Sequence, residues 1–279
     1  MHTDSRRGAV RAVLLALCAA GALAAAVGPA GAAGPIRLSI AFDPDAALGS
    51  ATALDVTLRL DPRRLTRAPL NEVRFAYPRS LGIVSSGLGL AVCRRPEADF
   101  AKVLITGPRL GGCSPNAVMA LGTALALVRL TNGQVIPEYA TVTLLSGPLE
   151  RGHLGLVAFV DGQRPFGAKL AFAGDVHGAP APYGGELTVR MPAVPGLEDL
   201  ATVSLVELRV SIGSHAIRYY ERRGGRRVAY HPEGVLLPTA CPAHGFRFRV
   251  RVGFSDGSRQ SARAVTPCPM PVAAPASGL

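Results

Sequence analysis

Apolar and basic residues alternate regularly from Phe246 to Phe254, close to the end of the chain. Side chains of a β-strand point alternately to its two faces, so this period of two predicts a strand with one apolar and one basic face. The basic face carries Arg247, Arg249 and Arg251. We expect the apolar face to be buried in a sheet.

A second strand is predicted to return antiparallel to the first. Asp256-Gly257 has turn chemistry, because glycine adopts a positive φ without steric cost. A three-residue loop over 256–258 places Ala262 opposite Val252 on the buried face of a strand at 259–265, whereas a two-residue loop would bring polar side chains there. We therefore expect the three-residue loop.

The same alternation, interrupted by glycine and proline, recurs along the chain and predicts many short strands. Residues 119–130 alternate small with large side chains, which favours a strand, although alanine and leucine also suit a buried helix. Residues 219–230 predict a hairpin whose tip holds Arg222, Arg223, Arg226 and Arg227. The other predicted strands are 36–42, 54–60, 73–77, 136–145, 154–160, 168–173, 187–191 and 206–212.

One short helix is predicted at Pro96–Ile105. Pro96 suits the first helical position, and Phe100, Val103 and Leu104 form an apolar stripe at helical spacing. The sequence therefore predicts an all-β fold, with one or more antiparallel β-sandwiches, one short helix and two segments stapled by disulfides.

Two β-rich halves or domains are expected, 33–149 and 150–269, with the boundary near Gly147–Gly152. The stretch Gly178–Gly185, which holds two prolines, has the composition most like a linker. A disordered tail is expected over 270–279.

The first 32 residues have the three-part pattern of a secretory signal peptide: arginines before residue 12, an apolar run over 12–27, and Ala30-Gly31-Ala32 as a cleavage site. An uncleaved membrane anchor is the alternative. We expect a secreted or extracellular protein with no integral membrane span in its mature chain.

Four cysteines remain after such cleavage: Cys93, Cys113, Cys241 and Cys268. An even number in an exported chain indicates disulfides, and pairing of nearest neighbours is the simplest of three possible arrangements. The alternative is a metal site, because Cys241 and His244 have Cys-x-x-His spacing. We expect the disulfides Cys93–Cys113 and Cys241–Cys268, and neither a metal nor a cofactor.

Composition supports short strands and an aliphatic core, since the chain has 32 glycines, 23 prolines, 5% aromatic residues and no tryptophan. The net charge is +11, and without residues 1–32, which hold three arginines and one aspartate, it is +9. Nearly all of the positive charge is arginine. This charge favours acidic partners without identifying one.

The carboxyl-terminal pattern resembles secreted, uncharacterised β-rich proteins of GC-rich Gram-positive bacteria, of actinobacterial type. The resemblance covers about half of the mature chain and implies an exported β protein, but it carries over no catalytic or binding residue. Ser114 departs from it, because proline is expected there. The matching motifs are Thr239-Ala-Cys241-Pro242, Gly245-Phe-Arg-Phe248, Phe254-Ser-Asp-Gly257, Pro267-Cys268-Pro269 and, less closely, Cys113-Ser-Pro115.

Three functions fit the sequence. The first is an exported, non-catalytic β-sandwich protein of the cell envelope or exterior with a structural or binding role, whose partner is unknown. The second is a binder of an anionic polymer, through Arg247, Arg249 and Arg251 with Arg263 and the four arginines of the hairpin. The aromatic platforms typical of single-strand recognition are missing from that face.

The third function is a secreted hydrolase. Its candidate groups are His153, His177 beside Asp175, Glu186, His215 and His231, none of which forms a recognisable motif. Convergence of several of these groups at one place would favour the hydrolase. For the polymer binder, the equivalent observation is whether the two arginine clusters face the same way.

Overall fold

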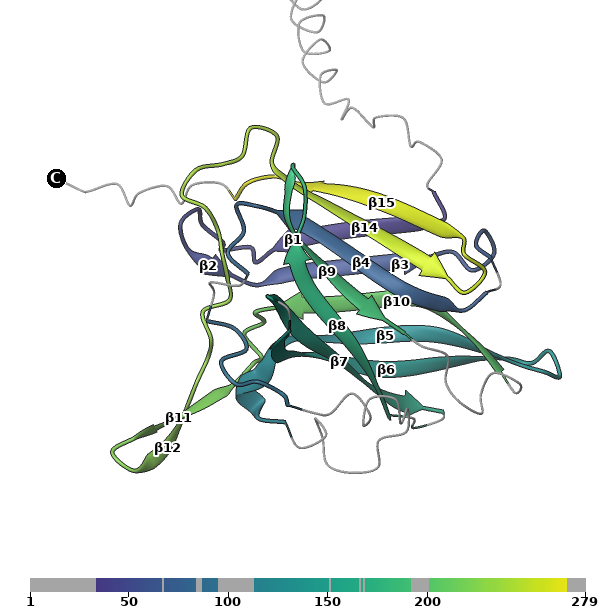
Figure 1. The fold of residues 1–279 in the computed structure, drawn as a ribbon, viewed down its shortest axis with the longest axis horizontal. Coiled ribbons are helices and arrows are strands. Elements are labelled where there is room, and N and C mark those ends of the chain that lie inside the picture. The colour runs from purple at the N-terminus through teal and green to yellow at the C-terminus, as the bar shows by residue number, and fades with distance from the viewer. Residues whose placement is uncertain are drawn as a thin grey trace, which may run out of the picture. The chain divides into compact units, whose positions relative to one another are not determined.

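The main sheet contains eleven antiparallel strands in the part of the chain that the structure describes (Figure 1). The structure is a computed structural model and describes residues 34–66, 68–83, 87–94, 113–150, 152–165, 167, 169–191 and 201–269. The predicted all-β, antiparallel fold is confirmed. The sheet order is β1 (Ile36–Phe42), β3 (Leu54–Leu60), β10 (Ala201–Ile212), β5 (Val118–Leu130), β6 (Val135–Glu150), β7 (His153–Arg164), β8 (Lys169–Gly178), β9 (Tyr183–Arg190), β4 (Leu70–Pro78), β14 (Phe246–Phe254) and β15 (Arg259–Thr266).

Three small elements accompany the main sheet. The strands β11 (Tyr219–Arg223) and β12 (Arg226–Tyr230) form the predicted hairpin, and β13 (Val235–Leu236) pairs with β2 (Ala51–Thr52). A 3-10 turn, η2, covers Pro115–Ala117. In the described residues no helix is both long and apolar enough to cross a bilayer. The predicted helix at 96–105 and the two chain ends, 1–32 and 270–279, lie outside the described residues.

The sheet nearly closes on itself, because its two edge strands, β15 and β1, lie side by side (Figure 1). The Thr266 hydroxyl of β15 donates to the Ile40 carbonyl of β1 at 3.1 Å, and the rings of Phe42 and Phe246 meet at 5.0 Å. Every described neighbour in the sheet is antiparallel, and the number of strands is odd, so β1 and β15 run in the same direction. This near closure gives the sheet an inner and an outer face.

The inner face holds the main core. Phe246, Phe248, Val250 and Val252 are almost completely buried there, as the alternation of β14 predicted. Burying a side chain of this size stabilises the fold by about 1.5–3 kcal/mol relative to leaving it exposed. The arginines of β14 consequently lie on the outer face.

A second core covers part of the outer face. Leu145 of β6 and Val157 and Phe159 of β7 point outward, where Ile217 and Tyr219 pack on them. The segment before β5 and the base of the β11–β12 hairpin thus form an outer layer over these strands.

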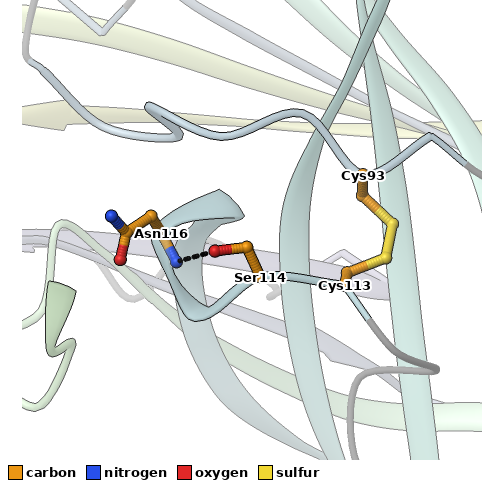
Figure 2. Close-up of a disulfide and its surroundings, with 4 residues drawn as sticks. All are labelled: Cys93, Cys113, Ser114 and Asn116. Atoms are coloured by element: carbon orange, nitrogen blue, oxygen red, sulfur yellow. Dashed lines mark hydrogen bonds between the residues drawn. A yellow bond between two sulfur atoms is a disulfide. The ribbon is translucent and has the colours of Figure 1, made fainter. Parts of the chain in front are cut away.

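Both predicted disulfides are present. Cys93 pairs with Cys113, next to the turn η2, where the Ser114 hydroxyl accepts from the Asn116 N–H at 3.2 Å (Figure 2). Cys241 pairs with Cys268 and closes the loop that carries β14 and β15. Two disulfides indicate an oxidising environment.

The predicted register between β14 and β15 is wrong by one residue at the turn. Ala262 lies opposite Val250 rather than Val252, because the turn comes earlier: the Phe254 N–H donates to the Ser258 carbonyl, and the Gly257 N–H donates back to the Phe254 carbonyl. The loop keeps its three-residue length, so Ala262 stays on the expected face.

The stretch Gly178–Gly185 is a tight hairpin turn between β8 and β9, not a linker. The two predicted halves, 33–149 and 150–269, contribute strands to the same sheet, and β6 and β7 pair directly across the expected boundary. The hairpin between β8 and β9 matters most for the site, because it sets two charged strands side by side.

Candidate functional site

A charged cluster occupies the outer face of β8, β9, β4 and β14. The register places His177 opposite Glu186, Glu186 opposite Ala76, and Ala76 opposite Arg249. Residues directly opposite one another in neighbouring strands project to the same face. Ala76 is small, so the long side chains on either side of it can meet above β4.

Glu186 lies at the centre of this cluster and is only 4% exposed. Its Oε2 accepts from Arg251 Nη2 at 2.7 Å and from Arg249 Nη2 at 3.4 Å. Its Oε1 lies 3.9 Å from Arg74 Nη1 and 3.8 Å from His177 Nε2. A buried carboxylate is tolerated here because cations surround it.

Arg249 is held from two sides. Besides its contact with Glu186, its guanidinium stacks over the ring of Tyr183, with 4.6 Å between the carbon and the ring centroid. The Arg249 side chain is 21% exposed, and its Nε has no hydrogen-bond partner in the described part of the chain. Arg249 and Arg251 are therefore partly neutralised, although the sequence alone suggested free cations.

Several of the hydrolase candidates come together beside Glu186. His177 Nδ1 and Asp175 Oδ2 are 3.0 Å apart, and Asp175 also accepts from Arg190 Nη1 at 2.9 Å. The His153 ring meets the His177 ring edge-on at 5.9 Å. The convergence that would favour a hydrolase is thus present for His153, His177, Asp175 and Glu186.

The described side-chain contacts of His177 are with acidic groups and with the ring of His153. Both ring nitrogens of His177 face carboxylates, and among the described residues no hydroxyl or thiol hydrogen-bonds to it. Thr188 lies on the same face, but it is 1% exposed and its hydroxyl has no partner among the described residues. Among the described residues, the histidine and carboxylates of this cluster are therefore not paired with a side-chain nucleophile of the kind that nucleophilic catalysis uses.

The other two histidines lie elsewhere. His215 Nε2 is 2.9 Å from Asp43 Oδ2, and His231 Nδ1 is 2.9 Å from the Ile217 carbonyl oxygen. Neither touches the charged cluster. Their positions therefore add no support to the hydrolase hypothesis.

A further ion pair borders the cluster on β4. Arg74 donates to Glu72 through Nε at 2.7 Å and through Nη2 at 2.9 Å. This bidentate contact lowers the pKa of the Glu72 carboxyl below its ordinary value of 4.5 and raises the pKa of Arg74. Glu72 therefore stays ionised and does not act as a proton donor near neutral pH.

A belt of arginines continues from β14 around the outer face of the nearly closed sheet. Arg263 of β15 lies opposite Arg249, and Arg37 of β1 lies opposite Arg59 of β3. β1 and β15 run in the same direction, and Thr266 of β15 bonds to Ile40 of β1. Arg263 precedes Thr266 by three residues and Arg37 precedes Ile40 by three, so these two arginines lie at the same height along the two strands. We call this belt the basic band; it consists of Arg37, Arg59, Arg209, Arg247, Arg249, Arg251 and Arg263.

The basic band has more cations than its acids can neutralise. Glu207 binds Arg59 at 2.6 Å and also binds Arg209. Both hydrogen bonds lower the pKa of Glu207, and the one from Arg209 has the larger effect. One acid is thus shared by two arginines, as Glu186 is shared by Arg249 and Arg251. Arg37, Arg247 and Arg263 are exposed and have no ion-pair partner among the described residues.

The two arginine clusters predicted from the sequence do not face the same way. Arg222, Arg223, Arg226 and Arg227 lie on the β11–β12 hairpin, which projects on the opposite side of the molecule from β14 and β15 (Figure 1). Arg227 stacks over the Tyr220 ring at 3.8 Å, and Arg223 pairs with Glu221. The hairpin is therefore a separate surface.

Sequence reasoning missed the arginines that β1, β3 and β10 contribute to the basic band: Arg37, Arg59 and Arg209. Each alternates with apolar residues in its own strand, so its outward direction was readable. The sequence does not show that these strands continue the sheet beyond β15, because that depends on β1 lying beside β15. Comparison of the chain with protein-family models, with curated proteins and with solved structures finds no match.

Proposed function

We propose that this protein is an exported, non-catalytic protein of the cell exterior or envelope that binds an anionic polymer with the basic band. One observation carries the proposal: arginines from five adjacent strands, β14, β15, β1, β3 and β10, line one outer surface. Three of them, Arg37, Arg247 and Arg263, lack an acid partner among the described residues.

Arginine is suited to this role, because its planar guanidinium can donate two parallel hydrogen bonds to a phosphate, sulfate or carboxylate group. Neighbouring strands are about 4.8 Å apart, so the five strands present cations over roughly 19 Å. A surface of that width can contact several anionic groups of one chain. Repeated weak contacts of this kind give binding that falls steeply with salt.

The surface favours a polymer without bases, such as an acidic or phosphate-bearing polysaccharide. Proteins that hold single-stranded nucleic acid stack its bases on exposed aromatic side chains. The large aromatic residue exposed among the described residues is Tyr139, which lies on β6 and not in the basic band. The Tyr183 ring is already covered by Arg249.

Export is supported by two independent features. The disulfides Cys93–Cys113 and Cys241–Cys268 are typical of an oxidising compartment. The pattern of residues 1–32 is that of a signal peptide, which we propose is cleaved near Ala32. The resemblance to secreted β-rich proteins supports the same location.

The test is retention of the mature protein on a heparin column over a salt gradient. The variant R37S/R247S/R263S should elute at lower salt than the wild type. The control R129S/R164S/R218S removes the same charge from exposed arginines that also lack an acid partner among the described residues but lie outside the band. Each phosphate-type contact makes the affinity for heparin fall more steeply with salt. Because R37S/R247S/R263S lacks three such contacts, the wild type should lose roughly 20- to 40-fold more affinity than this variant over an about fourfold rise in salt.

Equal losses in the two triple variants would contradict the proposal, because they would indicate a response to net charge alone. Passage of the wild type through the column at low salt would contradict it directly. Shortening of the heparin during the experiment would instead support the hydrolase hypothesis and direct attention to His177 and Glu186.

A further inference from the structure

The β11–β12 hairpin carries four arginines that the proposed function does not use. Arg222 lies opposite Arg227, and Arg223 lies opposite Arg226, on either side of the turn Gly224-Gly225. Like charges directly opposite each other destabilise a strand pair, and an isolated two-stranded hairpin is only marginally stable. An anion bound between the arginines would relieve that repulsion.

The two faces of the hairpin differ in charge. Arg222 and Arg227 share one face with Tyr220, whose ring supports Arg227, and no acidic residue of the hairpin lies on it. The opposite face carries Arg223 and Arg226, but Glu221 pairs with Arg223 there. The face with Arg222 and Arg227 is thus the better anion site.

The base of the hairpin is fixed to the body of the protein. The Asn116 side chain binds the Tyr220 backbone twice, donating to its carbonyl at 2.8 Å and accepting from its N–H at 2.8 Å. The buried Tyr219 hydroxyl donates to the Val118 carbonyl and accepts from the Gly89 N–H at 2.7 Å. Asn116 follows closely on the disulfide Cys93–Cys113, which anchors the same segment (Figure 2).

This anchoring places the hairpin on the far side of the molecule from the basic band. β7 is the sixth of the eleven described strands in the nearly closed sheet, so it lies across from the seam between β1 and β15. Tyr219, the first residue of the hairpin, packs on the outer face of β6 and β7, and the hairpin projects beyond them (Figure 1).

The distance between the two basic surfaces makes them independent. A folded domain of this length is on the order of 40 Å across. At physiological ionic strength, salt largely screens the interaction between exposed charges that are more than about 8 Å apart. An anionic chain on one surface therefore neither blocks nor repels a chain on the other.

We propose that the hairpin is a second anion-binding site, formed by Arg222 and Arg227, and that the protein bridges two anionic polymer chains. This inference rests on the proposed function, since the basic band holds the first chain. The second occupant is a chain of the same chemical class. A protein with two opposed sites cross-links such polymers, whereas one with a single site only coats them.

The experiment mixes biotinylated heparin, fluorescein-labelled heparin and a small amount of protein, and then captures the biotin on streptavidin beads. Protein on the beads reports binding to a single chain, and fluorescein on the beads reports bridging. With the wild type we expect both signals. With R222S/R227S we expect the protein to be retained and the fluorescein to fall to its level without protein, and the charge-matched control R129S/R164S should keep both.

The outcomes separate the two proposals. If no wild-type protein is captured, the proposed function fails and this inference fails with it. If wild-type protein is captured without fluorescein, or if R222S/R227S bridges as well as the wild type, only the inference is overturned. All variants should have the wild-type mass by light scattering, and bridging that follows a change in oligomeric state would also overturn the inference.

Discussion

Replacing Glu186 by glutamine should destabilise the fold and at the same time strengthen the binding of polyanions. The glutamine keeps the size of the side chain but removes the charge that faces Arg249 and Arg251. Breaking a buried ion pair from one side costs about 3–5 kcal/mol, whereas an exposed pair contributes about 0–1 kcal/mol. The side chain of Arg251 is 44% exposed and can turn to water, but that of Arg249 is only 21% exposed. We therefore expect E186Q to lower the free energy of unfolding by about 2 kcal/mol.

The measurement is equilibrium unfolding in urea followed by far-ultraviolet circular dichroism, since the chain has no tryptophan. The matched control is E207Q, because Glu207 also holds two arginines of the basic band. The Glu207 side chain is 24% exposed, and the side chains of its partners Arg59 and Arg209 are more than half exposed. E207Q should therefore lower the free energy of unfolding by at most about 1 kcal/mol. A loss in E186Q no greater than that in E207Q would refute the assignment of Glu186 as a buried counter-charge.

The same two variants test the link to function. E186Q releases two arginines from their acid, so the protein should elute from heparin at higher salt than the wild type. An acid that neutralises binding arginines in the unbound protein stabilises the fold but lowers the affinity for a polyanion. Such a trade-off between stability and function is common at binding sites. Unchanged elution of E186Q together with lowered stability would limit Glu186 to a structural role.

Three further predictions concern stability. Because the folded state lowers the pKa of Glu72, the free energy of unfolding should fall as the pH drops through 4.5 and below, and E72Q should weaken that fall in urea titrations at several pH values. Burial raises the pKa of Tyr219 above 10.0, so stability should decline at higher pH, and Y219F, which leaves two backbone groups unpaired, should cost about 1–3 kcal/mol in the same assay. C241A/C268A opens a loop with a sequence separation of 27 and should cost about 3–4 kcal/mol, and an unchanged urea midpoint would contradict a stabilising role.

The local pattern of the sequence was enough to identify most of the strands and their buried faces. In β14 the alternation of Phe248 and Val250 with Arg249 and Arg251 fixes both faces, because successive side chains of any strand point in opposite directions. The two disulfides were predicted as the simplest pairing of the four cysteines that remain if a signal peptide is removed. The turn before β15 was misplaced because several loop positions preserve the same alternation, and the pattern cannot choose between them.

The make-up of the candidate site was only partly readable. The sequence identified Arg249 and Arg251 as outward cations, but it gave no sign that Glu186 neutralises them. That contact exists because Gly178–Gly185 turns β9 back beside β8 and because β4 pairs with both β9 and β14. The composition of that stretch, rich in glycine and proline, fits a tight turn and a linker equally well.

The sequence by itself determined an antiparallel β protein with basic outer faces and two disulfides, since these properties depend on neighbours along the chain. The tertiary structure alone decided which strands adjoin, and so brought Arg37 beside Arg263, near the other end of the chain. The physical reason is that alternation tells which way a side chain points but is common to every strand, so it does not specify the partner. The near closure of the sheet supplied that information, and with it the basic band and the hairpin on the opposite side.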